Sequence, residues 1–100
     1  MSSNFTRHVE EDARLIILRE LHVQSDGRLN DGVLWHVLES FGHNRSREWV
    51  RTQLHKMAEL GAVVLTEAGS VLIAQITRAG VDHVLRRSKI EGIKQPSLGV

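Results

Sequence analysis

The side chains best suited to chemistry lie between residues 45 and 56. If residues 47–60 form a helix, the side opposite Val50, Leu54 and Met57 carries most of the polar groups. Arginine makes paired hydrogen bonds to guanine or binds phosphate, threonine and histidine reach base edges or backbone, and serine and lysine suit phosphates. An ordinary solvated helix surface is the alternative. The candidate contact residues of this stretch are Arg45, Ser46, Arg47, Trp49, Arg51, Thr52, His55 and Lys56.

The sequence contains six histidines and no cysteine, which leaves only His with Asp or Glu as metal ligands. His8 with Asp12 and Asp82 with His83 are the pairs that spacing offers, and we expect neither a metal nor a cofactor. Asp26, Asp31 and Glu39 are explained by turns, helix caps and solvation. Because no nucleophile triad, phosphate-binding loop or paired carboxylates occur, the sequence predicts a protein that is not an enzyme.

The bulk composition predicts one cytoplasmic domain. One hundred residues suffice for a single core, no disulfide can form, and no apolar run reaches the roughly 20 residues that cross a bilayer. The start lacks the apolar segment of a secretory signal. Residues 1–40 carry four arginines against seven acids, whereas residues 41–66 and 67–100 each have a net charge of +2. This asymmetry favours a polyanionic partner only weakly.

Apolar spacing predicts a first helix over residues 6–24, with Thr6 as its N-cap. Leu15 and Leu18 fall outside its main apolar stripe, so the helix is apolar on two sides. Two explanations remain open: the helix lies at the centre of the core, or one side meets a second subunit.

The remaining segments predict a strand at 28–29, helices at 31–41 and 47–60, and a hairpin of strands 62–66 and 71–76. Asn30, Ser46 and Thr77 are the predicted caps of the second, third and fourth helices. Gly61 completes an inward seam of the third helix, and Val81, Val84 and Leu85 point inward from the fourth. The chain is thus an α+β domain, mainly α with a small β-hairpin, over residues 1–89. Residues 90–100 form a tail that we expect to be ordered only against a partner.

Two segments resemble the winged helix-turn-helix superfamily. Residues 48–63, EWVRTQLHKMAELGAV, are similar to the recognition helix and wing entry of bacterial arsenic-repressor and multiple-antibiotic-resistance-repressor regulators. Residues 76–80, ITRAG, are similar to the start of the helix that follows the wing. The compact size also resembles small prophage-encoded regulators. The resemblance implies that the helix at 47–60 enters the major groove of double-stranded DNA.

The sequence departs from this pattern at two places. Trp49 stands where a smaller residue is usual, and it either packs against the second helix, contacts a thymine methyl or blocks the approach to DNA. The hairpin tip carries Glu67 and no basic residue, so Arg78 is the candidate phosphate contact beside it.

Three hypotheses follow. The first is a DNA-binding transcriptional regulator, predicted to be a homodimer from the two-sided first helix, the apolar tail residues Ile90, Ile93 and Leu98, and the two-fold symmetry of most operators. The second is a winged-helix protein–protein interaction module without specific DNA binding. The third adds a small-molecule or metal effector to the first, which only the histidine content motivates.

Overall fold

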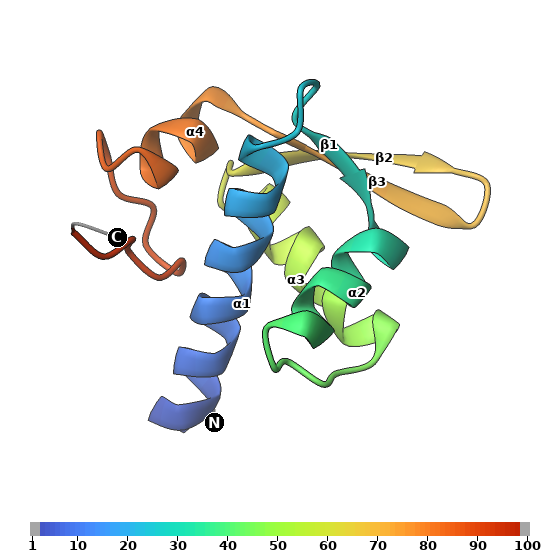
Figure 1. Ribbon diagram of the computed structural model, residues 1–100, viewed down its shortest axis with the longest axis horizontal. Helices are drawn as coiled ribbons and strands as arrows, with labels where there is room; N and C mark the ends of the chain where they lie inside the picture. The colour runs from blue at the N-terminus through green and yellow to red at the C-terminus, as the bar shows by residue number, and fades with distance from the viewer. Residues whose placement is uncertain (1–2, 99–100) are drawn as a thin grey trace.

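The computed structural model describes residues 3–98, so residues 1, 2, 99 and 100 of the predicted domain and tail lie outside it. Its order of elements is the predicted one (Figure 1). The helices are α1 (Asn4–His22), α2 (Asp31–Ser40), α3 (Arg47–Glu59) and α4 (Arg78–Val84). The strands are β1 (Arg28–Asn30), β2 (Val63–Ala68) and β3 (Val71–Ile76). The α+β class is therefore confirmed. No helix within residues 3–98 is long and apolar enough to cross a bilayer.

Side-chain caps begin all four helices. The predicted caps of α2, α3 and α4 are confirmed: Asn30 accepts from the Val33 amide at 2.9 Å, Ser46 from the Trp49 amide at 3.0 Å, and Thr77 from the Gly80 amide at 3.1 Å. The predicted cap of α1 is wrong. Ser3 caps this helix instead and accepts from the Thr6 amide at 3.0 Å, because a second hydroxyl three residues upstream allows the helix to start earlier.

The three strands form one antiparallel sheet in the order β1-β3-β2. β2 pairs with β3 from Val63↔Ile76 to Ala68↔Val71, so the predicted four-residue loop shrinks to a turn at Gly69 and Ser70. Gly69 adopts a φ of +60°, which favours glycine. β1 pairs only with the middle of β3, and the hairpin tip therefore extends beyond it (Figure 1).

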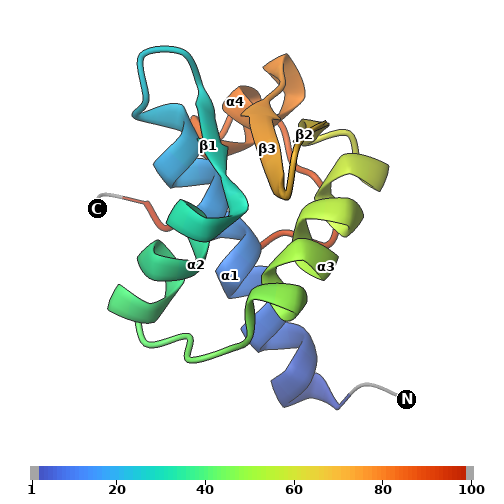
Figure 2. The same ribbon diagram turned by 90° about the vertical axis from the view of Figure 1, so that its right-hand side faces the viewer.

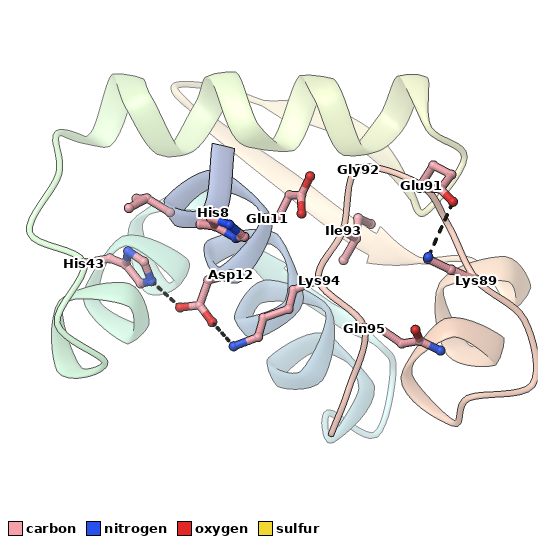
Figure 3. A pocket seen from close by; sticks show the side chains of 11 residues that line it. His8, Glu11, Asp12, His43, Lys89, Glu91, Gly92, Ile93, Lys94 and Gln95 are labelled. Carbon is pink, nitrogen blue, oxygen red and sulfur yellow. Dashed lines mark hydrogen bonds and ion pairs between the residues drawn. The ribbon is translucent and has the colours of Figure 1, made fainter. Parts of the chain in front are cut away.

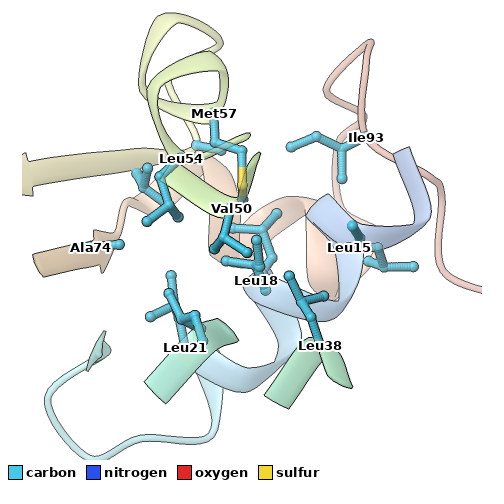
Figure 4. Packing of buried hydrophobic residues seen from close by; sticks show 14 of the residues in the cluster. Leu15, Leu18, Leu21, Leu38, Val50, Leu54, Met57, Ala74 and Ile93 are labelled. Atoms are coloured by element: carbon cyan, nitrogen blue, oxygen red, sulfur yellow. The ribbon is translucent and has the colours of Figure 1, made fainter. Parts of the chain in front are cut away.

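The core surrounds α1. Leu18 and Leu21 are fully buried with Leu38 of α2 and Leu54 of α3 (Figure 4). Leu15 is also buried, at 4% exposure. Both apolar sides of α1 are thus covered within one chain, which supports the first of the two explanations for its sequence.

Two predicted inward positions are wrong. Gly61 is exposed because α3 ends at Glu59 and the chain turns at Gly61 with a φ of +82°, and Gln53 is buried in α3 instead. α4 ends at Val84, so Leu85 is its C-cap and remains 44% exposed. The buried residues of α4 are Gly80 and His83.

The tail packs on its own chain, so the prediction that only a partner orders it is wrong. Ile93 is 3% exposed within the core, and the Lys94 amide donates to the Glu11 carbonyl at 3.1 Å. Arg14 donates to the Gly92 carbonyl at 2.8 Å. The His83 ring accepts from the Ile90 amide at 3.0 Å and donates to the Lys94 carbonyl at 2.9 Å. These bonds satisfy backbone groups that no regular element pairs.

Candidate nucleic-acid interface

α2 and α3, joined by residues 41–46, present one side of α3 at the surface (Figure 2). α3 buries Val50, Leu54 and Met57 as the sequence predicts, and no other element within residues 3–98 covers the opposite side in this view. The exposed residues on α3 are Glu48, Thr52, His55, Lys56 and Glu59. A helix with one anchored side and one free polar side has the shape that the major groove, about 12 Å wide, admits.

The nine predicted site residues divide into two groups. Six are exposed and three are partly buried. The exposed residues are Arg45, Ser46, Thr52, His55, Lys56 and Arg78, and the partly buried ones are Arg47, Trp49 and Arg51.

Arg78 lies apart from the other candidates. The preceding Thr77 hydroxyl donates to the Gly61 carbonyl at 2.7 Å, which places the start of α4 beside the C-terminal end of α3. Since the thirteen residues of α3 rise about 20 Å, Arg78 is well separated from Arg45 at the other end. Arg45 and Arg78 therefore lie at opposite ends of the candidate surface.

A cluster of Asp31, Arg47 and Arg51, called the Asp31 cluster below, occupies the N-terminal half of α3. Asp31 is fully buried, and its carboxylate accepts from Arg47 Nε at 3.2 Å, Arg47 Nη2 at 3.1 Å and Arg51 Nη1 at 2.6 Å. The Leu72 amide of β3 donates to it at 3.1 Å. The interpretation of Asp31 as a cap or solvated group is therefore wrong, because the carboxylate is buried and its side-chain partners come from α3.

These contacts control the ionisation of Asp31. Burial raises the pKa of this carboxyl, but the hydrogen bonds from Arg47, the Leu72 amide and Arg51 outweigh burial and hold the pKa well below its usual range. The same contact raises the pKa of Arg47. Asp31 is therefore ionised near neutral pH, and the cluster of one carboxylate and two guanidinium groups carries one net positive charge.

Two tryptophans shape the turn before α3. Trp35 Nε1 donates to the Arg45 carbonyl at 2.7 Å, and the Arg45 guanidinium lies 5.2 Å from the centroid of the Trp49 ring. Trp49 packs against the core cluster. Of the three roles left open for Trp49, the structure supports packing.

The candidate surface is less positive than the sequence indicated. The four cations of this surface have three carboxylates beside them, because buried Asp31 of α2 pairs with Arg47 and Arg51, a placement that the chain order does not reveal. Glu48 lies 3.9 Å from Arg51, and Glu59 lies 3.9 Å from Lys56. The surface therefore offers directed hydrogen-bond donors more than a strong positive field.

A cavity of about 620 Å³ lies elsewhere, between α1, His43 and the tail (Figure 3). Asp12 accepts from His43 at 2.7 Å and from Lys94 at 3.3 Å. Burial raises the pKa of Asp12, but these two hydrogen bonds outweigh it and lower the pKa below its usual value. Asp12 thus bonds to groups other than His8, and no three potential ligands within residues 3–98 are grouped for a metal.

Comparison with known proteins finds a relative encoded by a phage. Over 86 residues, the chain is 34% identical to the protein named "Uncharacterized protein gp26" of Escherichia phage Mu, a match covering 86% of this chain and 88% of that protein. The chain belongs to the same family as phage Mu gp26. No protein-family model matches the sequence, and no solved structure matches it. The name of this relative states no activity, so the functional argument depends on the geometry of the surface itself.

Proposed function

We propose that the protein is a cytoplasmic, phage-type transcriptional regulator of the winged helix-turn-helix class, not an enzyme, and that it places α3 in the major groove of double-stranded DNA. The observation that carries the proposal is the exposed polar side of α3, with Thr52, His55 and Lys56 in solvent and the opposite side anchored in the core. The similarity to a phage Mu protein supports the phage-type part of this proposal.

The hairpin has a smaller part in this proposal. It has no basic residue from Val63 to Ile76, and Glu67 is exposed near its tip. A carboxylate is repelled by phosphate and by the electronegative minor groove. We therefore assign DNA contact to α3 and the turn before it, with Arg78 as a separate contact with the DNA backbone.

The test begins with selection from random duplex oligonucleotides, followed by affinity measured over a range of salt concentrations. Lys56→Ala removes an exposed candidate phosphate contact and should reduce the salt slope by about 1. Arg87→Ala is the matched control, because it removes one exposed positive charge beyond α4, which packs on α1 and β3. Equal effects of the two substitutions would contradict the assignment to α3.

A protein–protein interaction module is the second candidate. It is favoured by the near balance of charge on the α3 surface and by Val64, which is 57% exposed on the hairpin. Selection that yields no consensus sequence, together with a stoichiometric protein complex lost on Val64→Asp, would favour this candidate over DNA binding.

A further inference from the structure

In the Asp31 cluster, only one edge of the Arg47 guanidinium is hydrogen-bonded. A guanidinium has five N–H donors on a rigid plane. Asp31 occupies the side edge of Arg47, formed by Nε and one N–H of Nη2. Within residues 3–98, the edge formed by Nη1 and the second N–H of Nη2 has no hydrogen-bond partner, and the side chain is 39% exposed.

The carboxylate that holds Arg47 is itself held firmly. Asp31 begins α2 and accepts from the backbone amides of Leu72 and of Gly32, each at 3.1 Å. Arg51, one helical turn after Arg47, bonds to Asp31 Oδ2, the oxygen that also accepts from Arg47 Nε, and is 24% exposed. The Asp31 carboxylate that orients the Arg47 plane is therefore held by groups of α2, α3 and β3 before any ligand arrives.

We infer that Asp31 is a positioning residue that orients the free edge of Arg47 to make two hydrogen bonds to one guanine. This inference rests on the proposed function. Guanine offers O6 and N7 side by side in the major groove, and two parallel N–H groups match them. Arg47 is the first residue of α3, and the N-terminal residues of a recognition helix are the ones that contact base edges. An oriented side chain also loses less entropy on binding.

Arg47→Lys tests the inference because it keeps the positive charge and removes the paired donors. The consensus duplex from the selection is compared with duplexes in which each G·C pair is changed to A·T. For the wild type, one such change should weaken binding roughly 5- to 150-fold. Arg47→Lys should lose that preference at one position. Its affinity for random DNA should stay within about twofold of the wild-type affinity, since the contacts with phosphate are unchanged.

Asp31→Asn separates positioning from folding. If Asp31 orients Arg47, this variant loses the preference at the same single base pair, whereas a purely structural role weakens binding to all sequences alike. In the free protein, the chemical shift of the Arg47 Nε–H should move in Asp31→Asn towards that of a solvent-exposed arginine. Arg47→Lys keeps the test valid if Asp31→Asn does not fold.

The possible failures are distinguishable. A wild type without any base preference would overturn the proposed function and this inference together. The inference alone would be overturned if the wild type has a consensus and Arg47→Lys keeps the same preference at every position of it. This holds whether Arg47→Lys binds the consensus as tightly as the wild type or more weakly by one common factor, and Arg47 would then be assigned to phosphate.

Discussion

Replacing Asp31 by asparagine should destabilise the fold in the absence of any DNA. Asparagine has nearly the same shape and retains one acceptor for the Leu72 or Gly32 amide, but it loses the charge that holds Arg47 and Arg51. Breaking a buried ion pair costs about 3–5 kcal/mol, and hydrogen bonds to charged groups contribute about 1.5–3 kcal/mol. Because both arginines are partly in solvent, we expect a loss of about 2–4 kcal/mol, at the lower part of these ranges.

That loss is measurable by thermal and urea unfolding followed by circular dichroism. For a domain of this size, it corresponds to a decrease in Tm of roughly 10–25 °C. Asp26→Asn is the control. It removes the same charge from an exposed site where Asp26 Oδ1 accepts from the Arg28 amide, a bond that asparagine can also accept. The control should change the free energy of unfolding by less than about 0.5 kcal/mol.

The pH dependence gives the same prediction an independent test. The pKa of Asp31 in the folded protein lies below its usual value, so ionisation of this group stabilises the fold above the ordinary carboxyl pKa of about 4. The stabilisation is lost as pH falls below that value towards the lowered pKa. The stability difference between wild type and Asp31→Asn should therefore be constant from pH 7 to about pH 5 and decrease in more acidic solution. A difference below about 0.5 kcal/mol at pH 7, or one that acid leaves unchanged, would refute the reasoning.

Two further predictions concern the tail and the oligomeric state. Ile93→Ala should lower the free energy of unfolding by about 2–4 kcal/mol because it leaves a cavity in the core. Leu98→Ala, at a side chain that is 77% exposed, should change this free energy little. Urea titrations that show equal effects of the two substitutions would contradict the packing of the tail. Light scattering should give twice the mass of one chain if the proposed homodimer forms. This expectation now depends mainly on operator symmetry, since α1 and Ile93 are covered within one chain, and a monomer at micromolar concentration would exclude it.

The elements of the fold are predictable from sequence because their signals are local. Asn30, Ser46 and Thr77 each act within three residues, and Val71–Ile76 is recognisable by itself as an apolar run of strand length with β-branched residues. The α1 cap was missed because Ser3 and Thr6 are equally good candidates by type. Local patterns therefore place the candidate surface on α3 without any knowledge of tertiary contacts.

The chemistry of that surface is not local. Asp31 reaches residues 16, 20 and 41 positions away along the chain, and an aspartate at the start of a helix is already explained by the helix dipole. One signal was available: Asn30 already caps α2, so a second acceptor beside it is not needed for capping. The buried position of His83 was missed for a similar reason, because its partners Ile90 and Lys94 lie in a segment without periodicity.

The Asp31 cluster also determines how strongly salt should oppose DNA binding. If all four cations of the surface and the separate Arg78 bound phosphates, each subunit would contribute about −4.5 to the slope of log K against log salt. With Arg47 and Arg51 held by Asp31, only Arg45, Lys56 and the separate Arg78 remain for phosphates, and the slope falls to about −2.7 per subunit. Affinity then depends on oriented hydrogen bonds more than on counterion release. A measured slope near the larger value would mean that the arginines leave Asp31 on binding, and that Asp31 stabilises only the free protein.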